Sequence, residues 1–218
     1  SCANNSFSLP GSGSEASCIC NAGYQGDNGG PCEACGTGTY KPSNGSVACT
    51  LCASGTYSDS EAADSSETCV GCPENTRSNR GSGSLEECIC DPGHHGADGE
   101  ACSACGPGTY KVVNGSSDCV ECGAGTYSTK TAQTSVDTCE VCPSGSSSLA
   151  GSGRLVDCIC VAGYTGRNGT ECEACSAGTY KSVIGSDACV ECESGTWSDA
   201  VGATSDTTCK ECLDFSTS

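Results

Sequence analysis

The chain has little with which to build an apolar core. It contains no Met, two Phe and one Trp in 218 residues, and much of its hydrophobic fraction of 35% is Cys and Ala. A chain that buries so little hydrocarbon does not offset its loss of conformational entropy by apolar burial alone. The composition therefore excludes ordinary domains built around a shared apolar core, and another source of stability is required.

Positive charge, histidine and long apolar runs are also scarce. Nine Lys and Arg against 27 Asp and Glu give a net charge of −18, which argues against nucleic acid or an anionic membrane as partner. No run of about 18 apolar residues occurs, so we expect no membrane insertion in this segment. The only histidines, His94 and His95, are adjacent, whereas Ser-His-Asp or Cys-His catalysis needs a His held in place by a scaffold. We therefore expect no catalytic residue, no cofactor and no enzymatic activity.

Cysteine is what the chain has in abundance. Its 25 cysteines exceed the roughly 8–10% that marks a disulfide scaffold in a secreted chain. Nine C-x2-C pairs leave zinc as the alternative, but the histidines are two and the cysteines recur in strict serial order. We predict twelve disulfides, one unpaired cysteine and no metal site, and with them an oxidising, extracellular compartment.

The cysteines recur at a spacing of 70 residues without one insertion. The equivalent sets are Cys2, Cys72, Cys142 and Cys212; Cys18, Cys88 and Cys158; Cys20, Cys90 and Cys160; Cys32, Cys102 and Cys172; Cys35, Cys105 and Cys175; Cys49, Cys119 and Cys189; Cys52, Cys122 and Cys192; and Cys69, Cys139 and Cys209. This spacing predicts three repeats, 2–71, 72–141 and 142–211, and a segment 212–218 that opens a fourth. We therefore expect the chain to be a fragment of a longer protein.

A shorter motif recurs inside each repeat. Cys-x-x-Gly-Thr-Tyr occurs twice, as at Tyr40 and Tyr57, with Trp197 at the last of the six positions. A shortened form, Cys-x-x-Gly-Tyr, places Tyr24 and Tyr164, and His94 occupies that position in the second repeat. The rings are either a ligand-stacking surface or packing on neighbouring disulfides, with Gly supplying a turn of positive φ. One ring per covalent loop favours packing.

Eight cysteines per repeat admit 105 pairings, so spacing alone does not fix the connectivity. A serial scheme is the most economical, because it leaves the C-x-C and C-x-x-C segments as short tethers between loops. It pairs Cys2 with Cys18, Cys20 with Cys32, Cys35 with Cys49 and Cys52 with Cys69, repeats this in the next two repeats, and leaves Cys212 unpaired. Loops of this size gain about 3 kcal/mol each from the crosslink.

The fold class that follows is a tandem series of small disulfide-rich modules. Contacts between sequence neighbours predict an elongated rod. Short β-hairpins around the Thr-Tyr segments and Gly-Ser turns, as in 81–84, are expected, with essentially no helix.

Four N-x-S/T sequons predict N-glycans on surface loops. They begin at Asn4, Asn44, Asn114 and Asn168, and Ile184 replaces the asparagine in the third repeat.

The motifs resemble known families. Segment 18–32, with Cys-x-Cys-x-x-Gly-Tyr-x-Gly closing on Cys32, looks like the C-terminal half of an EGF-like module. The following Cys-x-x-Gly-Thr-Tyr loops resemble the ephrin-receptor-like cysteine-rich repeat and, in look, the first loop of tumour-necrosis-factor-receptor modules. Tandem arrays with the wording CICNAGY, GTYK and GTYS are similar to those of large surface proteins of unicellular algae and other flagellates, including flagellar-hair proteins. The Asp-x-Asp/Asn-Glu set that binds calcium in EGF-like members is absent.

Two functions of different class remain open. The resemblance and the invariant repeat favour a structural protein of a filament or coat, outside the cell, at the cell surface or on a flagellar appendage. Its partners would be itself, as a homopolymer, or other extracellular structural proteins. The alternative is the ligand-binding ectodomain of a receptor or adhesin, which should concentrate unusual residues in one repeat.

Overall fold

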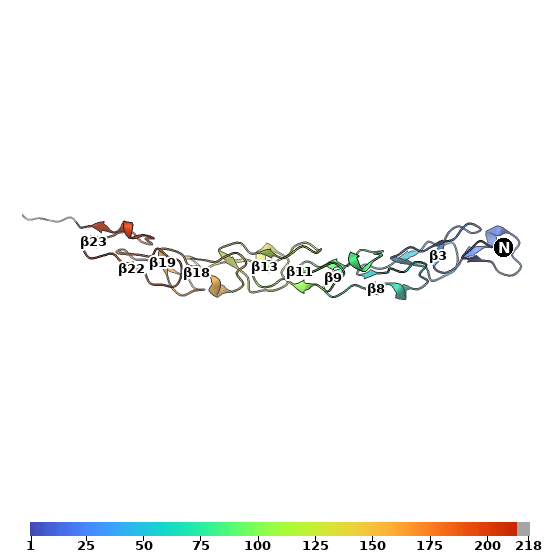
Figure 1. The fold of residues 1–218 in the computed structure, drawn as a ribbon, viewed down its shortest axis with the longest axis horizontal. Coiled ribbons are helices and arrows are strands. Elements are labelled where there is room, and N and C mark those ends of the chain that lie inside the picture. The colour runs from blue at the N-terminus through green and yellow to red at the C-terminus, as the bar shows by residue number, and fades with distance from the viewer. Residues whose placement is uncertain (213–218) are drawn as a thin grey trace, which may run out of the picture. The chain divides into compact units, whose positions relative to one another are not determined.

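The computed structural model describes residues 1–212 of the chain (Figure 1). They form two compact units, one made of Ser1–Ser103 with Val113–Asp118 and the other of Ala104–Val112 with the residues from Cys119 onward. The boundary between the units falls inside the second repeat, and the repeat bounds taken from the sequence stay a prediction. Of the segment predicted to open a fourth repeat, Cys212 is described and the rest lies outside the described residues.

The regular structure consists of two-residue strands that pair antiparallel with the next strand along the chain. The strands are β1 (Ser6–Phe7), β2 (Ile19–Cys20), β3 (Tyr24–Gln25), β4 (Glu33–Ala34), β5 (Thr39–Tyr40), β6 (Thr50–Leu51), β7 (Thr56–Tyr57), β8 (Val70–Gly71), β9 (Thr76–Arg77), β10 (Ile89–Cys90), β11 (His94–His95), β12 (Ser103–Ala104), β13 (Thr109–Tyr110), β14 (Val120–Glu121), β15 (Thr126–Tyr127), β16 (Glu140–Val141), β17 (Ser146–Ser147), β18 (Ile159–Cys160), β19 (Tyr164–Thr165), β20 (Glu173–Ala174), β21 (Thr179–Tyr180), β22 (Val190–Glu191), β23 (Thr196–Trp197) and β24 (Lys210–Glu211). Tyr40 pairs with Thr50, directly after Cys49, and Tyr57 pairs with Val70, directly after Cys69. The prediction of short hairpins at the Thr-Tyr segments is confirmed.

The cysteines are joined in serial order along the chain. Twelve disulfides link each odd-numbered cysteine of a repeat to the next, with Cα–Cα distances of 5.5 to 5.8 Å. The buried hydrophobic side chains of the described residues are all Cys or Ala, and Cys20, Cys35 and Cys52 are fully buried. The disulfides therefore take the place that aliphatic side chains hold in an ordinary core. Cys212 carries an exposed free thiol.

The described residues contain no α-helix, but they do contain six single turns of 3-10 helix that the sequence analysis missed. These turns are η1 (Glu15–Ser17), η2 (Ser66–Thr68), η3 (Leu85–Glu87), η4 (Val136–Thr138), η5 (Leu155–Asp157) and η6 (Asp206–Thr208). Each ends directly before the closing cysteine of its loop. The Ser65 side chain accepts a hydrogen bond from the Glu67 N–H at 3.2 Å, so a capping serine was the available signal.

Each disulfide-closed loop is hydrogen-bonded to the loop that follows it. In the first unit the Gly38 N–H donates to the Ser58 carbonyl at 2.7 Å, and the Cys52 N–H donates to the Gly38 carbonyl at 2.8 Å. In the second unit the Gly108 N–H donates to the Ser128 carbonyl at 2.8 Å in the same way. These bonds between sequence neighbours are the condition for a chain that folds as a linear series of modules.

The glycine of the Gly-Thr-Tyr motif is required for two reasons. Gly38 has a φ of +71°, a conformation that side-chain-bearing residues rarely adopt. A Cβ on Gly38 would also lie 2.1 Å from the Gly81 carbonyl oxygen, and one on Gly108 would lie 2.2 Å from that of Gly151. The glycine therefore sets a turn and admits the backbone of the loop two places further along the chain.

Candidate functional site

A buried lysine follows the first Gly-Thr-Tyr motif of every repeat. Lys41, Lys111 and Lys181 are only 2%, 1% and 2% exposed. The Lys41 ammonium group donates hydrogen bonds to the carbonyl oxygens of Tyr24 and Gly45. We call this arrangement the lysine clamp. Because Tyr24 lies in the loop closed by Cys20–Cys32 and Gly45 in the loop closed by Cys35–Cys49, the clamp ties two loops together.

The clamp is repeated in the second unit, where the Lys181 ammonium group donates to the Tyr164 carbonyl at 2.7 Å and to the Gly185 carbonyl. Burial of an ammonium group is costly unless hydrogen-bond acceptors replace water. Burial lowers the pKa of Lys41 below its usual value. The sequence analysis missed the clamp, although lysine at a strict 70-residue step in a chain with nine Lys and Arg was a usable signal.

The predicted glycosylation sites differ in exposure. Asn4, Asn44 and Asn114 are exposed, and the Asn44 side-chain oxygen accepts a hydrogen bond from the Ala22 N–H at 2.8 Å. Asn168 is half-buried, and its side-chain oxygen is buried without a hydrogen-bond partner among the described residues.

We expect N-glycan occupancy in secreted protein to be high at Asn44 and Asn114 and low at Asn168. A glycan leaves from the amide nitrogen, and it needs an asparagine whose side chain lies open to solvent in the folded chain. Glycopeptide mass spectrometry after enzymatic deglycosylation in heavy-oxygen water measures occupancy at each site. Full occupancy at Asn168 would contradict the structural ranking.

The aromatic side chains of the motif are mostly half-buried. All seven tyrosines have intermediate exposure, which favours their interpretation as packing groups over that of a ligand-stacking surface. His94 lies in strand β11, where the other repeats have Tyr24 and Tyr164, as the sequence analysis expected. The exception is Trp197, which is 46% exposed and has the Lys210 ammonium nitrogen 5.1 Å from its ring centroid.

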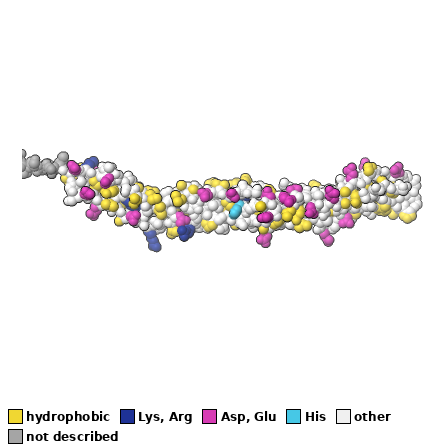
Figure 2. Space-filling view, in the orientation of Figure 1, with side chains coloured by type: hydrophobic (Ala, Val, Ile, Leu, Met, Phe, Trp, Pro, Cys, Tyr) yellow, Lys and Arg dark blue, Asp and Glu magenta, His cyan; other side chains and the backbone are white. Residues whose placement is uncertain are grey.

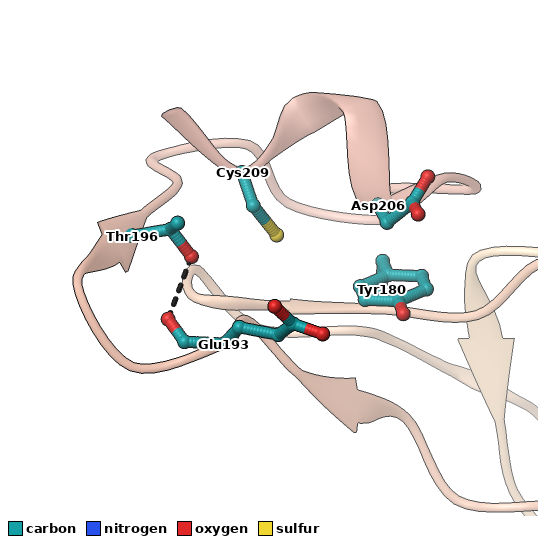
Figure 3. A pocket seen from close by; sticks show the side chains of 5 residues that line it. All are labelled: Tyr180, Glu193, Thr196, Asp206 and Cys209. Atoms are coloured by element: carbon teal, nitrogen blue, oxygen red, sulfur yellow. Dashed lines mark hydrogen bonds between the residues drawn. The ribbon is translucent and has the colours of Figure 1, made fainter. Parts of the chain in front are cut away.

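The third repeat contains a small pocket of about 230 Å³ (Figure 3). Its lining residues are Tyr180, Glu193, Thr196, Asp206 and Cys209. The carboxylates of Glu193 and Asp206 lie on the two sides of the Tyr180 ring in Figure 3. The Thr196 hydroxyl donates to the Glu193 carbonyl oxygen at 2.7 Å and so fixes the turn below the ring.

The pocket's two acids are specific to the third repeat. Glu193 and Asp206 stand where the first repeat has Ala53 and Ser66 and the second has Gly and Val. Cys209 is in a disulfide with Cys192 and offers no thiol. The lining therefore supplies negative charge, hydroxyl groups and one ring face, a combination that suits a cationic group and holds neither a histidine nor a free amine.

The surface as a whole is acidic. Figure 2 shows Asp and Glu side chains scattered over the visible face, with Lys and Arg at few places. Three of the chain's nine Lys and Arg residues are the buried clamp lysines, so few cations offset the 27 carboxylates at the surface. Within residues 1–212, no three His, Cys, Asp or Glu side chains gather in a group that could hold a metal ion. The described part of the chain also has no helix long and apolar enough to cross a membrane.

Comparison with known families agrees with the disulfide geometry. The family model described as "Tyrosine-protein kinase ephrin type A/B receptor-like" matches residues 23–69, 93–139 and 163–209, which together make up more than half of the chain. The chain belongs to this family. In the first ephrin-receptor-like repeat, the matched residues contain the disulfides Cys35–Cys49 and Cys52–Cys69 and the lysine clamp. No curated protein matches the chain.

Membership in the ephrin-receptor-like family sets the general class of function. The family is a cysteine-rich, receptor-like repeat and not a catalytic domain, and tandem disulfide-rich repeats of this class suggest an extracellular module. The likeness of the segment before the match to an EGF-like module stays a prediction.

Proposed function

We propose that the chain is a non-enzymatic extracellular structural repeat protein that forms or coats a filament, at the cell surface or on a flagellar appendage. The observation that supports it is the exact repetition of loop-to-loop contacts. The Gly55 N–H donates to the Ser78 carbonyl at 3.0 Å in the first unit, and the Gly125 N–H donates to the Ser148 carbonyl at 2.9 Å in the second. Units that repeat at a fixed step offer identical lateral surfaces, which suits helical or sheet-like assembly.

The partners that fit this proposal are further copies of the chain or other extracellular structural proteins, with N-glycans on the exposed sequons. The acidic surface opposes nucleic acid and keeps an extended array soluble through self-repulsion.

A second candidate function is the ligand-binding ectodomain of a receptor or adhesin. The observation that favours it is the pocket around Tyr180, because Glu193 and Asp206 occur in one repeat only. A site confined to one repeat is what a receptor needs and what a uniform filament does not.

Electron microscopy of native material distinguishes the two functions. We expect filaments with an axial periodicity set by the 70-residue repeat, because stacked modules advance by the same step in each repeat. Solution scattering of the isolated chain should give a radius of gyration well above the roughly 17 Å of a compact 218-residue globule. A radius near 17 Å would refute the extended array, and dispersed monomers in native material would favour the receptor.

A further inference from the structure

The junction between the first and second repeats is a defined interface. The Gly81 N–H donates to the Cys52 carbonyl at 3.0 Å, and the Ser58 N–H donates to the Ser82 carbonyl at 3.1 Å. The turn around Gly81 and Ser82 is thereby seated on the loop closed by Cys52. A Cβ on the next glycine, Gly83, would lie 2.4 Å from the Thr37 hydroxyl oxygen, so the seat fits closely.

The junction between the second and third repeats has the same contacts. The Gly151 N–H donates to the Cys122 carbonyl at 2.9 Å, and the Ser128 N–H donates to the Ser152 carbonyl at 3.1 Å. A Cβ on Gly153 would lie 2.9 Å from Cβ of Pro107. The chain therefore contains two copies of one turn-on-loop interface.

The end of the third repeat presents the loop half of this interface without its turn. A groove of about 560 Å³ is lined by Gly178, Cys192 and Ser198, which are the equivalents of Gly38, Cys52 and Ser58. A Cβ on Gly178 would meet no described atom within 4 Å, whereas the equivalent Cβ on Gly38 meets the Gly81 carbonyl. Among residues 1–212, the Ser198 N–H has no hydrogen-bond acceptor. We call this groove the acceptor face; its other lining residues are Ser176, Ala177, Thr179, Glu191, Thr196 and Trp197.

The start of the first repeat presents the turn half without its loop. A hollow of about 460 Å³ is lined by Ser12 and Gly13, the equivalents of Ser82 and Gly83. Cβ atoms on Gly11 and Gly13 would meet no described atom within 4 Å, although both glycines of the second repeat are in close contact with the preceding loop. We call this surface the donor face; its other lining residues are Ser1, Cys2, Ser8, Ser14, Glu15 and Cys18.

We propose that the acceptor face of one copy of this chain binds the donor face of a second copy, head to tail. The internal junctions define the contacts: the Gly11 N–H of the second copy donates to the Cys192 carbonyl, and the Ser198 N–H donates to the Ser12 carbonyl of the second copy. The Cys212 N–H already donates to the Gly195 carbonyl at 2.9 Å, as the Cys142 N–H does to that of Gly125, so the second copy supplies only the turn.

Such a contact is heterologous and does not close on itself, so it extends an array one copy at a time. It deepens the proposed filament function, on which its biological role rests, by naming the surface that lengthens the filament. The faces carry like charge, Glu191 on the acceptor and Glu15 on the donor, in a chain of net charge −18. Association should therefore strengthen as salt screens the repulsion.

Sedimentation equilibrium of the full chain tests this contact. A Cys212→Ser background removes disulfide dimers formed through the exposed thiol. We expect the weight-average mass to rise with protein concentration past that of a dimer, and to rise further between 0.05 and 0.5 M NaCl, written as approximate settings of about a tenfold range around the screening length of the protein's surface charges. Gly13→Glu, whose side chain would occupy the space of the contact without touching its own fold, should abolish the rise.

Gly123→Glu is the matched control. Gly123 is an exposed glycine without positive φ, a Cβ there meets nothing within 4 Å, and the third repeat carries Glu193 at this position. It adds the same charge and should leave association unchanged. A monomer under every condition, or equal loss of association in both variants, would overturn the proposal.

Association that appears only after deletion of residues 213–218 would also overturn it, because the acceptor face would then belong to the chain's own tail. The contact and the filament function fail separately. Native filaments together with a monomeric isolated chain reject the head-to-tail contact alone. Association that Gly13→Glu abolishes, without filaments in native material, rejects the filament function alone.

Discussion

Complete reduction of the disulfides in native buffer is expected to unfold the whole chain. The buried hydrophobic side chains of residues 1–212 are Cys and Ala only, so no aliphatic core remains once the sulfur–sulfur bonds are broken. The closed loops span sequence separations of 12 to 17 residues, and crosslinks of that size contribute roughly 3 kcal/mol each. Two-residue strand pairs without such crosslinks are not stable in water.

Hydrogen exchange before and after reduction and alkylation measures this effect. Amides bonded between loops, such as those of Gly38 and Cys52, should lose their protection entirely. Treatment with a metal chelator in place of the reductant should change nothing, and intact mass should show one free thiol before reduction, at Cys212. Retained protection at Gly38 after full alkylation of 25 cysteines would refute the view that disulfides replace the core.

The cysteine spacing made most of the fold predictable. Pairing each cysteine with the next closes loops whose second strand begins right after the closing cysteine, as Thr50 does after Cys49, and the Thr-Tyr segments supply the first strands. The glycine of that motif was expected to serve a turn of positive φ. Its second role, which is to admit the Gly81 backbone at Gly38, depends on a loop more than 40 residues away and has no local signal.

The candidate sites were less predictable, because each combines residues from loops whose approach the sequence does not encode locally. The pocket around Tyr180 needs Glu193 and Asp206 to meet across the loop closed by Cys192–Cys209. Two acids thirteen residues apart look like ordinary surface charges in an acidic chain. In the same way, a lysine after a strand suggests solvent exposure, and only the approach of the Tyr24 and Gly45 carbonyls buries Lys41.

Substitution of the clamp lysine in the first repeat is expected to loosen that repeat and leave the third intact. Lys41→Met keeps an unbranched side chain of similar length but leaves the Tyr24 and Gly45 carbonyls without their donor. Buried acceptors that lose a charged partner cost on the order of 3 kcal/mol together, which corresponds to a roughly hundredfold rise in local exchange rate. Hydrogen exchange of the Gly45 N–H, which donates to the Cys20 carbonyl, reports this change directly.

Two comparisons make the lysine test specific. Lys130→Met removes a lysine whose side chain is 59% exposed and whose Glu140 partner is 3.9 Å away, so it should change exchange by less than about 1 kcal/mol. The Gly185 N–H, which donates to the Cys160 carbonyl in the third repeat, should exchange as in the parent chain, because each loop bonds only to its neighbours. Unchanged exchange at Gly45 would show that the clamp carries no stability, and equal loosening at Gly185 would show that the modules are coupled over the whole chain rather than one to the next.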